Sequence, residues 1–187
     1  MGKKDKFKIV EKQCGHGHAK VSLVKRKSDG KLFIWKRPKS GRGSGSLQGQ
    51  IKRSKLWRKF GISKVKVNWC PDKHSLLKTF VNGHTLKHYF KNGKVSFSKK
   101  SKKLKALKEF VKLLIKSKHY IHDLKGQNIV WDEKMWNVID SGPIEGKSSK
   151  SSVRRKYRKN LLEKWSNSLD SNKERHSLEE FLDSVKV

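Results

Sequence analysis

Residues 119–142 constrain this chain more than any other stretch, because they set a group of chemically useful side chains into a hydrophobic frame. The polar members are Asp123, Lys125, Asn128 and Asp140. Apolar pairs at 129–130 and 138–139 separate them into two short clusters. Asp and Asn are ordinary turn formers, which would explain some of these positions. Turn formation does not explain a lysine and two carboxylates at this spacing, so the stretch indicates a site for chemistry.

The order of these residues resembles the catalytic centre of the protein kinases. In that family, an aspartate of the catalytic loop accepts the proton of the attacking hydroxyl. An asparagine five positions later holds one magnesium ion, and a later aspartate in an Asp-Phe-Gly sequence holds another. The resemblance implies these roles for Asp123, Asn128 and Asp140, in that order, and it puts Lys125 near the transferred γ-phosphate.

A kinase of this kind should also carry, near its start, a Gly-rich loop over the phosphates and a lysine on the following strand. Residues 14–21 resemble such a loop, and Phe-Ile-Trp-Lys at 33–36 resembles the strand with its lysine. Taken alone, the glycines suit an ordinary turn better than a phosphate-binding loop. Residues 76–86 look like the strand and hinge that join the two kinase lobes. The resemblance implies that ATP is bound by Gly15, Gly17, Ala19, Val21, Lys36, Phe80 and Val81.

The resemblance runs from about residue 7 to residue 142 and implies an α+β, two-lobed protein-kinase-like fold. Residues 1–83 would form a small β-lobe with one helix, and residues 84–187 a reduced helical C-lobe. Alternating apolar residues and turn signals predict strands at 7–10, 19–25, 32–37, 65–69 and 76–81, and a helix at 47–60.

In the second half, apolar residues at helical spacing predict helix within 86–118. A Lys/Ser-rich linker is expected to run to Ser152, followed by a helix with Val153, Tyr157, Leu161, Trp165 and Leu169 on one stripe. A last helix should begin at Ser177, with Glu180 at the capping-box position and Phe181, Leu182 and Val185 facing inward.

The chain departs from the kinase pattern in four ways. His122 stands directly before Asp123, where most protein kinases have an arginine that clamps a phosphorylated activation loop, so such control should be absent. Ser141 replaces the phenylalanine of Asp-Phe-Gly. No acid lies between Asp29 and Asp72, so Gln48 or Gln50 would have to replace the helix glutamate that pairs with the strand lysine. Residues 143–187 are too few for a full peptide-docking platform.

These departures leave three functions open. The first is an ATP- and Mg²⁺- or Mn²⁺-dependent Ser/Thr protein kinase that also phosphorylates itself, similar to minimal, atypical kinases such as the RIO group. The second is a kinase-fold enzyme acting on a sugar, similar to the bacterial kinases of the lipopolysaccharide core. The third is a weakly active, pseudokinase-like protein that binds nucleotide or polyanion.

The net charge is the other strong feature: 48 Lys and Arg against 16 Asp and Glu give +32 at pH 7. Such a field attracts anionic glycan or lipid surfaces, nucleic acid and ATP itself. The resemblance to kinases adds an acceptor protein as a partner. A solvated basic surface without a partner is the alternative. Acidic residues are rare between Lys12 and Asp123: that stretch contains Asp29, Asp72 and Glu109.

Composition narrows the compartment and excludes some classes of protein. The two cysteines, Cys14 and Cys70, have neither zinc-site spacing nor a disulfide pattern, which fits a reducing compartment. No apolar run approaches a membrane span, and residues 1–6 lack a signal-peptide core. We therefore expect a cytoplasmic protein. The alternatives are a protein associated with a membrane surface and one exported without a recognisable signal. The sequence contains no P-loop.

Overall fold

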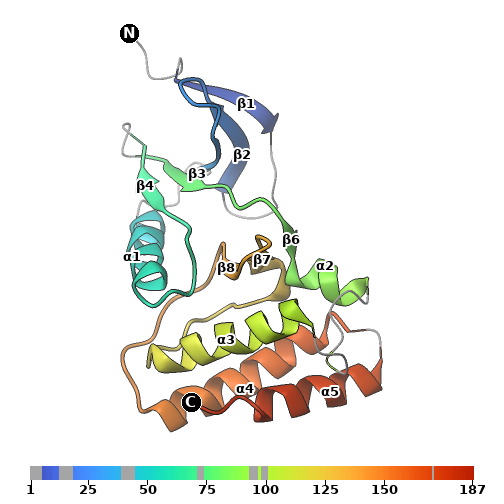
Figure 1. The fold of residues 1–187 in the computed structure, drawn as a ribbon. Helices are drawn as coiled ribbons and strands as arrows, with labels where there is room; N and C mark the ends of the chain where they lie inside the picture. The colour runs from blue at the N-terminus through green and yellow to red at the C-terminus, as the bar shows by residue number, and fades with distance from the viewer. Residues whose placement is uncertain are drawn as a thin grey trace. The chain divides into compact units, whose positions relative to one another are not determined.

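The computed structural model of the 187-residue chain describes residues 6–12, 19–38, 45–70, 74–92, 97, 101–169 and 171–187. These residues form strands and helices in a mixed α+β arrangement (Figure 1). The chain divides into two compact units. The first unit comprises Met1–Arg58 and Val65–Phe80, and the second comprises Lys59–Lys64 and Val81–Val187. The division between Phe80 and Val81 lies close to the boundary after residue 83 that the sequence predicts.

The first unit is built on a five-stranded antiparallel sheet with the strand order β1-β2-β3-β5-β4. Its strands are β1 (Phe7–Lys12), β2 (Ala19–Arg26), β3 (Leu32–Pro38), β4 (Val67–Trp69) and β5 (Leu76–Thr79). The turn between β2 and β3 is stabilised by Asp29, which pairs with Arg26 and accepts a hydrogen bond from the Lys31 backbone. All five strands fall within or next to the ranges predicted from alternation.

One helix, α1 (Gly45–Lys59), belongs to the same unit (Figure 1). The helix is strongly polar, yet Ser54 and Trp57 are buried. The Ser54 hydroxyl donates to the Ile51 carbonyl at 2.9 Å, so its burial leaves the hydroxyl hydrogen-bonded. The predicted range 47–60 is close to the observed helix.

The second unit combines a small sheet with four helices. Its sheet has the strand order β6-β7-β8 and consists of β6 (His84–Thr85), β7 (Ile129–Trp131) and β8 (Trp136–Val138). The described helices are α2 (Leu86–Lys91), α3 (Lys102–Lys116), α4 (Lys150–Ser166) and α5 (Asn172–Asp183), and a 3₁₀ turn, η2 (Gly126–Asn128), precedes β7. Within this unit, α3 lies between the β7–β8 hairpin and α4, and α5 packs along α4 (Figure 1).

The core of the second unit follows the apolar stripes read from the sequence. The buried positions of α3 and α4 are Leu107, Phe110, Val111, Leu114, Ile115, Val153, Tyr157, Leu161 and Trp165. Each set recurs every three or four residues, which puts it on one face of its helix. Leu169 lies beyond the end of α4 and is only half-buried. Among the described residues, no helix is both long enough and apolar enough to span a membrane.

The starts of α4 and α5 differ from the prediction. The helix α5 begins at Asn172, after the N-cap Ser171, whose hydroxyl accepts from the Glu174 amide at 3.2 Å; the predicted start at Ser177 is wrong. Ser171 and Glu174 have the same three-residue spacing as Ser177 and Glu180, and the earlier start lets the helix bury Leu178 completely. The expected linker is shorter too, because α4 begins at Lys150.

Candidate functional site

The loop before η2 holds Asp123 in an unusual backbone conformation. Its φ is +59°, in the left-handed region that side-chain-bearing residues seldom adopt. Two donors grip the Asp123 carbonyl: the Lys125 amide at 2.8 Å and the Asn128 side-chain amide at 3.0 Å. The Lys125 ammonium lies 3.1 Å from the Asp123 carboxylate. Asp123, Lys125 and Asn128 are thus in direct contact, and the side chain of Asn128 donates to the backbone of Asp123.

Side chains of helix α4 hydrogen-bond to the backbone of this loop and of the residues before it. The indole of Trp165 donates to the carbonyl of Leu124 at 2.9 Å, and Leu124 is fully buried. The hydroxyl of Tyr157 accepts from the Ile121 amide and donates to the His119 carbonyl, both at 2.9 Å. Burial raises the pKa of Tyr157, so the phenol stays neutral. The sequence pattern identifies both aromatics as core residues but misses these bonds, although buried Tyr and Trp usually seek a polar partner.

A glycine lets the start of α2 approach the same loop. Gly126 is buried in η2, and a Cβ there would lie 3.0 Å from the Lys87 backbone nitrogen. A side chain there would therefore require α2 or η2 to shift by a few tenths of an ångström.

The segment carrying Asp140 follows β8 and returns to the loop. The Ile139 amide donates to the backbone carbonyl of Asn128 at 2.8 Å. Asp140, the next residue, therefore lies near Asn128. Gly142 packs so closely that a Cβ would lie 3.0 Å from the His122 Cβ and 3.3 Å from the Asp123 Cβ. The two acidic segments therefore meet at a point where a side chain would be tightly crowded.

Ser141, the residue that the resemblance to kinases aligns with phenylalanine, is buried and makes local hydrogen bonds. Its hydroxyl donates to the Gly142 carbonyl at 3.0 Å, and its amide donates to an Asp140 carboxylate oxygen at 3.0 Å. The second bond fixes the orientation of the Asp140 carboxylate.

The donor atoms of Asn128 and Asp140 suit a magnesium ion. The side-chain nitrogen of Asn128 donates to Asp123, so the side-chain oxygen of Asn128 is the atom that could bind a cation. Mg²⁺ prefers such oxygens and typically takes one or two protein carboxylates together with phosphates and water. Within the described part of the chain, no group of three or more His, Cys, Asp or Glu side chains is arranged to hold a metal. A magnesium ion here would need the phosphates of a nucleotide to complete its shell.

The residues predicted to bind nucleotide are divided between the units. In the first unit, Lys36 on β3 pairs in register with Val21 on β2, and Ala19 pairs with Pro38. Phe80 ends that unit, and its amide lies 3.4 Å from the Leu32 carbonyl. Val81 begins the second unit, to which Asp123, Lys125, Asn128 and Asp140 also belong. Gly15 and Gly17 lie outside the described residues.

The two glutamines of α1 differ sharply. Gln48 is exposed, whereas Gln50 is 8% exposed, and its side-chain oxygen has no hydrogen-bond partner among the described residues. Buried polar atoms are normally satisfied. Gln50, in the same unit as Lys36, is therefore the glutamine equipped to accept a hydrogen bond from a lysine.

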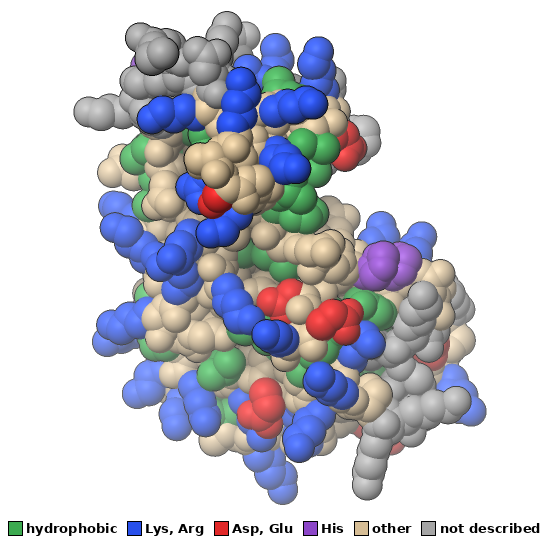
Figure 2. Space-filling model, turned by 45° about the horizontal axis from the view of Figure 1, so that its top comes forward, with side chains coloured by type: hydrophobic (Ala, Val, Ile, Leu, Met, Phe, Trp, Pro, Cys, Tyr) green, Lys and Arg blue, Asp and Glu red, His purple; other side chains and the backbone are tan. Residues whose placement is uncertain are grey.

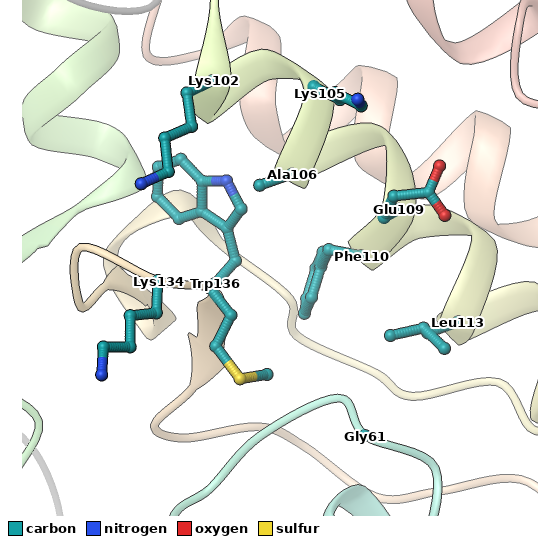
Figure 3. Close-up of a pocket in the computed structure, with 10 residues that line it drawn as sticks. Gly61, Lys102, Lys105, Ala106, Glu109, Phe110, Leu113, Lys134 and Trp136 are labelled. Carbon is teal, nitrogen blue, oxygen red and sulfur yellow. The ribbon is translucent and has the colours of Figure 1, made fainter.

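A cavity of about 340 Å³ lies elsewhere in the second unit, between α3, Gly61 and the β7–β8 turn. Figure 3 shows Phe110 and Leu113 along α3 and the ammonium-bearing Lys102 and Lys134 at the Trp136 end. None of its lining residues is among those predicted for catalysis or nucleotide binding.

Basic side chains are widely distributed over the face of the molecule that Figure 2 shows. Figure 2 shows Lys and Arg side chains over the whole visible face, with acidic side chains scattered among them. Some of the acids are paired: Arg158 on α4 bonds to Glu179 and Asp183 on α5.

Comparison with known proteins assigns no family to the chain. No protein-family model matches it, and no curated protein matches it.

Proposed function

We propose that this chain is an ATP-dependent phosphotransferase with a two-lobed protein-kinase-like fold that moves the γ-phosphate to a hydroxyl. Asp123 would orient and deprotonate the acceptor, and Lys125 would lie near the transferred phosphate. Asn128 and Asp140 would hold Mg²⁺ or Mn²⁺, which supplies charge neutralisation at the phosphates. Lys36 would contact the α- and β-phosphates.

The observation that carries this proposal is the gathering of Asp123, Lys125, Asn128 and Asp140 around one strained loop. The Asn128 bond to the Asp123 carbonyl and the 3.1 Å contact of Lys125 with the carboxylate are specific, and Gly142 packs against Asp123 itself. A simple turn needs none of these contacts. Strained backbone held by several partners is typical of functional sites.

The strand order and composition of the first unit support the same proposal. A five-stranded antiparallel sheet with one helix is what the resemblance implies for an N-lobe, and the second unit is mainly helical.

The acceptor is proposed to be a Ser or Thr side chain, including those of the protein itself. A sugar hydroxyl is the second candidate, favoured by one observation: α4 begins at Lys150, so residues 143–149 alone separate Gly142 from the next helix. A segment this short offers little surface for docking a peptide.

The test is transfer of label from γ-labelled ATP with magnesium, with the protein alone and with protein, glycan and RNA acceptors. We expect label on the protein itself and on a protein acceptor. Label on glycan alone would select the second candidate, and nucleotide binding without any transfer would reject the enzyme.

Asp123→Ala is the decisive variant. It should bind nucleotide nearly as well as the wild type but turn over at least about a hundredfold more slowly, because general bases contribute on this scale. A folded variant with normal turnover would mean that Asp123 is not the base.

A further inference from the structure

The segment after Asp140 runs antiparallel to the segment before Asp123. The Gly142 amide donates to the His122 carbonyl at 2.9 Å, and the His122 amide donates to the Pro143 carbonyl at 3.0 Å. The ladder continues with the Glu145 amide, which donates to the Tyr120 carbonyl at 2.8 Å. These bonds join the two segments that carry the acids of the site.

Side chains close the far end of this ladder. The Glu145 carboxylate has one oxygen 2.9 Å from His122 Nε2 and pairs through the other with Lys156 on α4. The Lys156 ammonium lies 5.6 Å from the centre of the Tyr120 ring, and the Tyr120 and His122 rings meet edge to face, 4.7 Å apart. We call these four residues the Glu145 cluster.

The charges of the cluster are suited to a permanent contact. A hydrogen bond from Lys156, followed in strength by one from His122, holds the pKa of Glu145 below its ordinary value, so the carboxylate is charged at neutral pH. Glu145 is also the sole acid of the sequence between Asp140 and Glu163. No neighbour along that stretch can replace it.

We infer that Glu145 is a positioning residue of the proposed phosphotransfer site, which fixes the Asp140 segment against the Asp123 loop by pairing with His122 and Lys156. This rests on the proposed function. A carboxylate built into the chain does here what a phosphate added to such a segment would do, because both present oxygens to a cation beside the catalytic loop. The site is therefore assembled without phosphorylation of residues 143–149.

The test compares Glu145→Gln and Glu145→Asp with a matched control, Glu163→Gln, which removes an equal charge from an exposed position of α4. We expect Glu145→Gln to lower kcat by about tenfold or more with KM for the acceptor changed less than twofold. Glu145→Asp keeps the carboxylate and should retain at least a third of the wild-type kcat. The control should match the wild type.

Hydrogen exchange without nucleotide supplies a readout that does not depend on activity. The amides of His122, Gly142 and Glu145 should exchange roughly tenfold faster in Glu145→Gln than in Glu163→Gln, because the ladder opens more often. Unchanged exchange together with unchanged kcat would overturn the inference, as would equal losses in the Gln and Asp variants. A wild type that transfers no phosphate would reject the proposed function, and faster exchange would then leave Glu145 with a structural role alone.

Discussion

Asp123, the proposed catalytic base, has a strained backbone. Its left-handed φ costs of order 1–3 kcal/mol for a residue with a side chain, and the surrounding contacts must supply that energy. The donors from Lys125 and Asn128, and the close packing of Gly142, are the contacts that hold it. Asn128 thus has a structural task in addition to its proposed contact with metal.

Asp140 allows a direct test of the metal. If Asn128 and Asp140 bind one magnesium ion at the phosphates, nucleotide affinity in the wild type should rise about tenfold or more with magnesium. The increase should disappear in Asp140→Ala, which titration with a fluorescent nucleotide would measure. An equal magnesium effect in wild type and variant would remove Asp140 from the metal site.

Gln50 is the second residue to test, because its buried oxygen lacks a partner among the described residues. If it accepts from Lys36 when nucleotide binds, Gln50→Glu should raise kcat/KM by roughly threefold or more, since charge-assisted bonds are about twice as strong as neutral ones. Gln48→Glu, which adds the same charge at an exposed position, is the control.

Stability reports on the same pair independently of activity. Burying a carboxylate with no cation nearby would lower the free energy of unfolding by more than about 2 kcal/mol. A marked loss of stability in Gln50→Glu, measured by chemical denaturation, would contradict a lysine partner.

The sequence pattern can suggest the candidate residues of the site, but it cannot suggest the residues that support them. Asp123, Lys125, Asn128 and Asp140 lie close in the chain, so a local pattern reveals them. Glu145 pairs with His122 across 23 residues, and Trp165 reaches Leu124 across 41. Nothing in the local pattern indicates such partners, because the fold alone brings them together.

At the scale of elements, α4 does more than cover the core. Two residues of its buried stripe, Tyr157 and Trp165, also carry polar atoms. The Tyr157 hydroxyl and the Trp165 indole nitrogen bond to the backbone of residues 119–124. The sequence pattern does not locate the start of α4, because Ser149 is one of several serines that could cap a helix. In the structure, Ser149 is the cap, and its hydroxyl accepts a hydrogen bond from the Ser152 amide. Strands were predicted well, since alternation and turns are local signals.

Tyr157→Phe tests the support that α4 gives. The change keeps the ring but leaves the Ile121 amide without its acceptor. It also removes a donor from the His119 carbonyl, which keeps a longer bond of 3.4 Å from the Ser117 hydroxyl. We therefore expect a loss of about 1–3 kcal/mol in the free energy of unfolding at pH 7. Denaturant titration would measure it. A loss below about 0.5 kcal/mol would show that water replaces the hydroxyl.

The pH dependence of that difference has a definite sign. The folded state raises the pKa of Tyr157 above its ordinary value of 10.0, so its contribution is complete below pH 10 and falls as the pH rises further. The advantage of the wild type over Tyr157→Phe should therefore shrink above pH 10, by at most about 1.4 kcal/mol per unit. An advantage that grows with pH would contradict a buried neutral phenol.

At the scale of the whole molecule, a net charge of +32 should govern encounters with polyanions. If the protein neutralises several phosphates of duplex DNA, its affinity should fall about a thousandfold or more between 50 and 200 mM salt. Fluorescence anisotropy at several salt concentrations would measure the slope. Absence of binding at 50 mM would favour a solvated basic surface without such a partner.

The hydrogen bonds from α4 to the loop that carries Asp123 also bear on biosynthesis. Domains tend to fold as the ribosome delivers them, beginning at the N-terminus. The loop at 121–128 leaves the ribosome before Tyr157 and Trp165, the residues that fasten it. A nascent chain would therefore display its acids for some time without an ordered site, and the capacity for chemistry would arrive late in translation, when α4 docks.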